Sequence, residues 1–338
     1  MRRTNIFLLP FPIILLCMTA CGSTQQLIDT DTIKEAGKPN DFDLNGHDQL
    51  CCFIPIQDYD NNGTPLFSDT FHAAAENGVL SVDFYSVIKT VDKNPPEYYH
   101  AVLTANVNGT LYDFSADGQS SIDGLFELDL PVNGERTIPF QISNCSMNKG
   151  ENLLQVSLFT YNANYHETNH VYYDVVFTSK DEYKAKSAVP VTEIKDIKDV
   201  KTEKVNGRSI EELTPTPTSI IAEQYLTSEY DDNGIVKVKK DSPLQFQLFN
   251  LNENEGPSNR IGYSFAFSNG KPLKVWNGNA ILKTEMSESE FELTIPGHAD
   301  FPENERTDIS FVYVDSQNDK QNPYTQVQDR IGSYFFVN

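Results

Sequence analysis

Positive charge is scarce in this chain. Its 338 residues contain 26 Lys and Arg against 48 Asp and Glu, which gives a formal net charge of -22. Affinity for nucleic acid comes largely from basic side chains that neutralise phosphates. Anionic lipid headgroups likewise attract clusters of Lys and Arg. We therefore expect no nucleic acid to bind, and no docking on lipid headgroups through surface charge.

Several catalytic signatures are also missing. The sequence holds no G-x-S-x-G nucleophile elbow, no Gly-rich phosphate loop and no dinucleotide fingerprint. Tryptophan occurs once, at Trp276, without cysteines at the spacing of antibody domains. Acidic residues are too abundant to single out one glycosidase pair. We expect a protein that is not an enzyme and that uses no organic cofactor.

The one long apolar run stands at the N-terminus. Two arginines precede an apolar stretch from Ile6 to Leu16. That stretch is too short to span about 30 Å of hydrocarbon as a helix. A charged start, a short apolar core and small residues before a cut are typical of a secretory signal peptide. We predict that residues 1–20 are a signal peptide that cleavage removes.

The residues around this cut, Met18-Thr19-Ala20-Cys21, resemble the lipobox of bacterial lipoproteins. Met18 stands where that pattern usually has Leu. The resemblance implies that Cys21 is diacylated after cleavage, with palmitate as a label for the anchor, and two acyl chains hold a protein stably. It also implies an extracytoplasmic location at the bacterial cell membrane. A plain signal peptide followed by a chance cysteine is the alternative.

Two polar segments divide the rest of the chain. Residues 21–45 are polar and are expected to form a flexible tether. Residues 181–218 are charged and end in alternating Thr and Pro, which favours an extended spacer. A short helical or strand stripe at Ile194, Ile197 and Val200 is the alternative within it. The organisation predicted is therefore one module at residues 46–180 and a second at residues 219–338.

Both modules show the pattern of β-strands. Apolar and polar residues alternate in Phe126 to Leu130 and again in Phe291 to Ile295, as half-buried strands require. Asn-Gly and Asp-Gly pairs between such runs indicate hairpin turns. The one segment that favours a helix runs from Asp69 to Asn77, where three alanines follow Ser68 as a candidate N-cap.

An internal repeat relates the two modules. Residues 101–109 parallel residues 262–270, each ending in Asn-Gly, and residues 171–177 parallel the aromatic segment 331–337. Two copies of one β-module explain the nearly constant offset. Each half resembles the immunoglobulin-like or fibronectin-like modules that are common on bacterial surfaces. The expected fold is all-β, with two tandem immunoglobulin-like β-sandwiches after a cleaved lipoprotein signal peptide.

One motif has the form of a zinc site. His166, Glu167 and His170 match H-E-x-x-H, in which a helix directs two histidines to one zinc ion while the glutamate polarises water. The flanking segments predict strands, and the asparagines nearby favour a loop. A metal-dependent hydrolase that uses this motif is the alternative to a non-catalytic protein.

A second motif has the spacing of a calcium loop. Asp58, Asp60 and Asn62 precede Gly63, and Asp69 follows eleven residues after Asp58. Oxygen ligands at these positions suit a hard cation. A strand rather than a helix precedes the loop, so an ordinary turn is the alternative. Calcium is the metal ion that the sequence favours.

Three cysteines follow Cys21. Successive strand residues point to opposite faces, so one of Cys51 and Cys52 faces the core. A disulfide from Cys52 to Cys145 is our prediction for an oxidising compartment. Three buried thiols are the alternative.

We interpret the protein as a cell-surface lipoprotein that serves in binding, in adhesion or as a spacer. Sandwich modules bind through end loops or exposed edges. The predicted contact residues lie in one aromatic loop and are Tyr165, His166, His170 and Tyr172. The ligand would be a protein or a glycan, and a role as accessory subunit of an envelope complex is a further alternative.

Overall fold

The computed structural model describes most of the chain after residue 48. The described residues are 49–68, 71–164, 167–197, 218–222, 236–239, 244–251, 260–286, 290–297, 306–316 and 327–337. In these ranges no helix is long and apolar enough to cross a membrane. The predicted signal peptide, the tether and Cys21 lie outside them. Every element described is a β-strand, so the predicted all-β class is confirmed.

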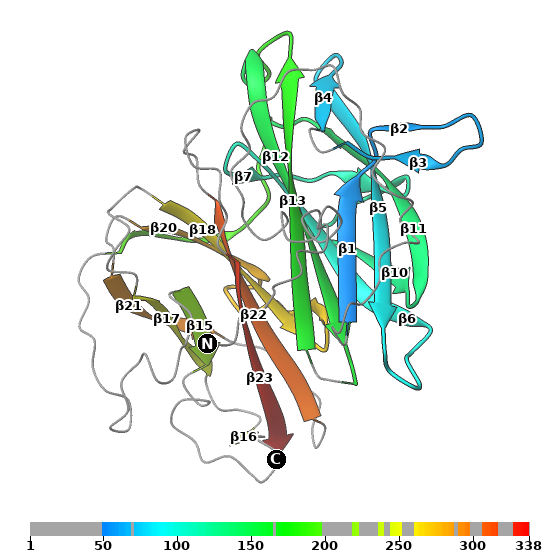
Figure 1. Ribbon diagram of the computed structural model, residues 1–338. Coiled ribbons are helices and arrows are strands. Elements are labelled where there is room, and N and C mark those ends of the chain that lie inside the picture. The colour runs from blue at the N-terminus through cyan, green and yellow to red at the C-terminus, as the bar shows by residue number, and fades with distance from the viewer. Residues whose placement is uncertain are drawn as a thin grey trace, which may run out of the picture.

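The first half forms a sandwich of two sheets (Figure 1). One sheet has the order β1-β5-β11-β8-β9, and its strands are β1 (Gln49–Pro55), β5 (Val79–Thr90), β11 (Gly134–Ser143), β8 (Ser115–Ala116) and β9 (Gln119–Ser120). The other has the order β10-β6-β12-β13-β4, with β7 paired to β6. Its strands are β10 (Phe126–Pro131), β6 (Tyr98–Val107), β12 (Gly150–Asn162), β13 (Glu167–Ser179), β4 (His72–Ala75) and β7 (Thr110–Leu111). A small hairpin joins β2 (Asp58–Tyr59) to β3 (Pro65–Leu66).

Alternating side chains build the core between these sheets. In β10, Phe126, Leu128 and Leu130 are buried while Glu127 and Asp129 are exposed. This is the two-residue period of a strand with one face against the core. Rings from both sheets fill that core, namely Phe53, Phe84, Phe114, Phe126, Phe140 and Phe177.

The second half repeats this arrangement. One sheet has the order β14-β20-β18-β22-β23-β16, with β19 paired to β18, and the other has the order β15-β17-β21. Their strands are β14 (Thr192–Ile197), β20 (Ile281–Met286), β18 (Arg260–Ser268), β22 (Arg306–Ser316), β23 (Val327–Val337), β16 (Val236–Lys239), β19 (Lys271–Pro272), β15 (Thr218–Ala222), β17 (Leu244–Leu251) and β21 (Glu290–Gly297).

The strand orders of the two halves correspond. The series β10-β6-β12-β13-β4 matches β20-β18-β22-β23-β16. In each series the last long strand pairs in parallel with a short strand, β13 with β4 and β23 with β16. Strand β7 pairs with β6 as β19 pairs with β18. The internal repeat in the sequence thus has a counterpart in the topology.

One asparagine turn recurs at the same place in both halves. Asn108 adopts a positive φ of 49°, donates its N–H to the carbonyl of Leu153 and accepts the Leu153 N–H on Oδ1, both at 3.0 Å. Asn269, with φ of 48°, makes the same two bonds with Asp308, at 2.8 Å and 3.0 Å. Asn tolerates this left-handed conformation, which explains the Asn-Gly pairs of the repeat.

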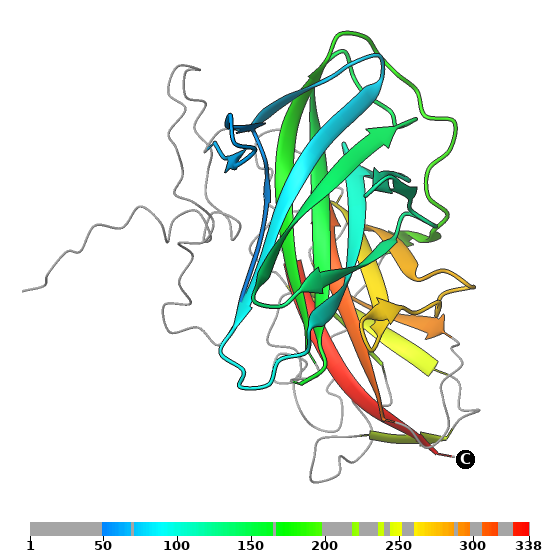
Figure 2. The same cartoon turned by 90° about the vertical axis from the view of Figure 1, so that its right-hand side faces the viewer.

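The two halves pack face to face rather than standing apart. The outer face of the six-stranded sheet contributes Val102 and Phe159 to an apolar cluster with β18 and β22. The Phe159 ring lies 5.1 Å from the ring of Phe265 and 5.0 Å from that of Phe267. Figure 2 shows the strands of the second half stacked against β12 and β13. The six-stranded sheet is therefore covered on its outer face around Val102 and Phe159, where the two halves are in contact.

Polar contacts fix the register of this packing. The Tyr161 hydroxyl donates to Asp308 at 2.6 Å, and the Tyr263 hydroxyl donates to the carbonyl of Gly109 at 2.9 Å. A Cβ on Gly270, whose φ is +78°, would lie 2.3 Å from the Cβ of Tyr161. Only glycine allows this approach. The Asn-Gly turn of each half thus contacts a tyrosine of the other half, Gly109 with Tyr263 and Gly270 with Tyr161.

One local prediction, the helix, was wrong, and part of the predicted spacer is a strand. The segment expected to be helical from Asp69 to Asn77 contains the edge strand β4, which pairs in parallel with β13. Phe71 and Ala75 enter the core there, and this burial outweighs the helix propensity of alanine. Within the predicted spacer at residues 181–218, strand β14 pairs in parallel with β20. That part of the predicted spacer belongs to the sheet of the second half that contains β20 and β18.

Candidate functional site

Two equivalent turns face each other where the halves meet. In the first, Ile122 and Leu125 exchange both backbone hydrogen bonds, at 2.9 Å and 3.0 Å, around Asp123-Gly124. In the second, Trp276 and Asn279 do the same around Asn277-Gly278, at 3.0 Å and 2.8 Å. The two central residues of each turn have positive φ, as this type of turn requires. Each turn leads directly into its sheet, at β10 and at β20.

A hairpin present only in the first half supports its turn. Strands β8 and β9 lie between β7 and the turn, where the second half runs from β19 to its turn without a described hairpin. Asp113 Oδ1 accepts the Gly124 N–H at 2.8 Å and the Ser121 hydroxyl at 3.0 Å. One carboxylate therefore ties the hairpin to the turn.

The segment that joins the halves contacts both turns, through Val189 and Thr192. Val189 is buried, and a Cβ on Gly124 would lie 2.6 Å from its side chain. Three residues later, the Thr192 hydroxyl donates to the carbonyl of Trp276 at 2.7 Å, and it accepts from Asn279 Nδ2 at 3.1 Å. These contacts fix one turn relative to the other.

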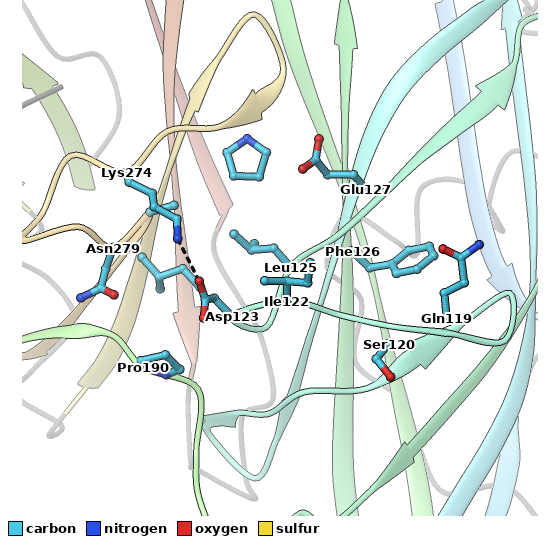
Figure 3. A pocket seen from close by; sticks show the side chains of 13 residues that line it. Gln119, Ser120, Ile122, Asp123, Leu125, Phe126, Glu127, Pro190, Lys274 and Asn279 are labelled. Atoms are coloured by element: carbon cyan, nitrogen blue, oxygen red, sulfur yellow. Dashed lines mark hydrogen bonds and ion pairs between the residues drawn. The ribbon is translucent and has the colours of Figure 1, made fainter. Parts of the chain in front are cut away.

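A crevice of about 310 Å³ lies between the turns (Figure 3). Its walls combine apolar and polar side chains from both halves. They are Gln119, Ser120, Ile122, Asp123, Leu125, Phe126, Glu127, Pro190, Pro272, Lys274, Asn279, Ala280 and Ile281. Figure 3 shows Ile122 and Leu125 between Asp123 and Phe126. The volume lies at the lower end of the range for ligand pockets, so it could hold a small group or a few side chains of a partner but not a large cofactor.

Charge around the crevice is mostly negative. Lys274 Nζ lies 3.1 Å from Asp123 Oδ2, with side chains 60% and 41% exposed, so this pair contributes little stability. Glu127, half exposed, lies with one carboxylate oxygen 3.1 Å from His100 Nε2. Among the charged lining residues, two acids thus stand against one lysine.

Exposure separates the two equivalent turns. Ile122 is 75% exposed, more than the other exposed large apolar side chains of the described residues. Trp276 opens the corresponding turn and is 1% exposed, with its ring 6.1 Å from that of Phe311. The repeat therefore places a core residue in one half and a solvent-exposed apolar residue in the other, at the mouth of the crevice.

The described part of the H-E-x-x-H motif does not lie on a helix, as a zinc site of this type requires. His166 lies outside the described residues, and Glu167 to His170 belong to strand β13 rather than to a loop. His170 instead stacks on Phe159 at 4.6 Å, inside the contact between the halves.

Burial determines the chemistry of His170. Both ring nitrogens are buried, and no hydrogen-bond partner stands beside either one in the described structure. Burial alone lowers the pKa of His170 to about 3, so the ring is neutral at physiological pH. Tyr172 stacks on its other side at 5.9 Å. The predicted contact residues His170 and Tyr172 thus take part in internal packing, while Tyr165 lies outside the described residues.

The calcium motif forms the hairpin of β2 and β3. Asp60 Oδ1 accepts the N–H groups of Thr64 at 2.7 Å and of Asn62 at 2.8 Å. The hydrogen bond from Thr64 is the main cause that lowers the pKa of Asp60. Asp58 Oδ1 accepts the Tyr59 N–H, and Asp69 lies outside the described residues. Among the described residues, no three His, Cys, Asp or Glu side chains gather as a metal ion would need.

The predicted disulfide between Cys52 and Cys145 is not formed, because these cysteines are thiols in the structure. Cys52 packs with Tyr85 and Val87 on the outer side of β1. Cys145 lies in the core on the other side of that sheet, where Cys51 also packs. Burial raises the pKa of Cys145 to about 11, so its thiol stays protonated and unreactive.

No family model matches this chain, and no curated protein matches it either. Among solved structures, it is similar to the CupB2 chaperone of Pseudomonas aeruginosa, at 8% identity and TM-score 0.21, over 78% of this chain and 98% of that one. The YadV chaperone is similar at 8% identity and TM-score 0.21, over 84% and 99%. A protein of unknown function from Porphyromonas gingivalis W83 shows 12% identity and TM-score 0.22, over 78% and 95%. Likenesses at these TM-scores carry no conclusion about function.

Proposed function

We propose that this protein is a non-catalytic, lipid-anchored binding protein of the bacterial envelope that holds a protein ligand at the crevice between its halves. The observation that supports this most directly is Ile122, which exposes an apolar side chain beside a formed crevice. Exposed apolar groups at a rigid, partly polar surface are typical of protein contact sites. The contacts of Val189 and Thr192 keep the crevice in shape without a ligand.

The anchor is part of the same proposal. The lipobox-like segment ending at Cys21 supports acylation, and residues 22–48 would serve as a tether between the membrane and the sandwich. Labelling of cells with a palmitate analogue should mark the wild-type protein and not Cys21→Ser. Labelling that persists in the variant would contradict the anchor.

Capture from envelope extract tests the ligand. The purified protein should retain an envelope protein that Ile122→Asp loses, because a charge at the mouth of the crevice opposes apolar contact. Val91→Asp is the matched control, since Val91 is 54% exposed and does not line the crevice. If Ile122→Asp retains the same partners as the control, the crevice is not the contact site. Binding to a glycan array with no protein captured would show that the ligand is a sugar and not a protein.

A further inference from the structure

Strand β10 is an edge strand of the six-stranded sheet, and half of that edge is closed. Asp129, in its second half, has its backbone carbonyl occupied by a guanidinium N–H of Arg136. The same guanidinium pairs with Asp117 on the loop between β8 and β9. A charged side chain laid over an edge in this way prevents another strand from pairing there.

The first half of β10 borders the crevice. Backbone groups on a strand point alternately toward one neighbour and the other. Since the carbonyl of Asp129 points away from β6, the N–H and C=O of Glu127 two residues earlier point the same way. Glu127 lines the crevice, and among the described residues no strand pairs with β10 on this side. The N–H and C=O of Glu127 therefore point away from β6, on the side where β10 has no strand partner in the described structure.

Side chains around this open edge define what could pair with it. Ile122 offers an exposed apolar side chain, and the largely buried Leu125 and Phe126 line the crevice beside it. Glu127 offers a half-exposed carboxylate, in a chain whose formal net charge is -22. An extended segment places alternate side chains on opposite sides, so an apolar residue and a neighbouring cation would meet both features.

We infer that the crevice binds an extended peptide segment of a partner protein, which adds as a short strand to β10 at Glu127 and carries Lys or Arg next to an apolar residue. This inference rests on the proposed function and specifies its ligand. Backbone hydrogen bonds give affinity in such strand addition, and alternate side chains give specificity. The closed half of β10 limits the added strand to a few residues.

A synthetic peptide of alternating Lys and Val, labelled with fluorescein, is the probe. Its twin carries N-methyl groups on alternate residues, which keep the charge but remove the N–H groups of one edge. Fluorescence anisotropy with the full chain should show at least about tenfold weaker binding of the methylated twin, because that peptide cannot donate hydrogen bonds to β10. Measurements at two salt concentrations separate this effect from general attraction to an acidic protein.

Two variants with the same charge change locate the site. Glu127→Lys should weaken binding of the unmethylated peptide at least about tenfold. Glu151→Lys, at an exposed position of β12 that does not line the crevice, should change it little. Equal binding of both peptides, equal effects of both variants, or no binding up to about 1 mM peptide would each overturn the inference.

The outcome is distinguishable from a failure of the proposed function. Loss of the envelope partner by Ile122→Asp would still support a protein ligand at the crevice, even if the peptides showed no preference. The ligand would then bind through side chains alone. Retention of the partner by that variant would contradict both the proposed function and the peptide inference, because both place the contact at the crevice.

Discussion

Asp174 should make this protein less stable as the pH rises from acid to neutral. Its side chain lies on the outer face of β13, where Gln155 Nε2 donates to Oδ1 at 3.1 Å. Burial raises the pKa of Asp174 to about 7, and the Gln155 bond offsets only part of that. In the unfolded chain an aspartate titrates near 3.9. The folded state therefore binds more protons between these values, and its stability falls as pH rises through that window.

The magnitude follows from the displacement of the pKa. About 3 units at about 1.36 kcal/mol per unit give about 4 kcal/mol as an upper value. Asp174 keeps some solvent contact, so we expect about 2–4 kcal/mol. Asp174→Asn imitates the protonated carboxyl, because the amide is neutral and its oxygen still accepts from Gln155. The variant should match the wild type near pH 4 and exceed it by that amount at pH 8.

Urea unfolding at several pH values measures the difference. Circular dichroism follows the sheets of both halves, and the fluorescence of Trp276 follows the second half, where this single tryptophan is buried. Asp181→Asn is the control, since it removes the same charge at an exposed position after β13. A difference between wild type and Asp174→Asn that stays constant from pH 4 to pH 8 would refute the reasoning.

The contact between the halves gives three more predictions. His170→Phe should raise the free energy of unfolding by about 1 kcal/mol, because it removes two buried nitrogens without hydrogen bonds. A lower urea midpoint for the variant would contradict this. Gly270→Ala should cost about 2–4 kcal/mol, from a strained φ and the clash with Tyr161. Gly278→Ala, with similar φ but open space, should cost only about 1 kcal/mol, and equal losses would refute the tight contact. Tyr161→Phe should cost about 1–3 kcal/mol in thermal or urea unfolding by removing the bond to Asp308, and an unchanged stability would show that this bond contributes nothing.

Local patterns in the sequence predicted the strands and their turns well. Alternation marked β10, and Asn-Gly pairs marked the turns at Asn108 and Asn269, because a two-residue period and a positive φ are properties of neighbouring residues. The matching segments of the two halves occupy equivalent strands for the same reason. The helix expected near Ala75 failed because its partner, β13, lies about one hundred residues later.

Features that depend on both halves could not be read locally. The alternation of β12 shows which residues face the first core, but not that Phe159 on the other face meets Phe265. A signal was present, since both faces of this strand are rich in uncharged residues, as in sheets covered on two sides. The crevice was missed for the same reason. Comparison of Ile122 with Trp276 across the repeat would have identified the unusual exposed position.

The shared apolar cluster also has a consequence for biosynthesis. The first half is translated before β18 and β22, so its sheet is complete while the surface at Val102 and Phe159 is still uncovered. During that interval the surface is open to other nascent chains. Its proper cover is tethered to it, and a tether of this kind gives an effective concentration that free chains do not reach. Covalent connection between the halves thus protects the protein from association with its own copies before folding is complete.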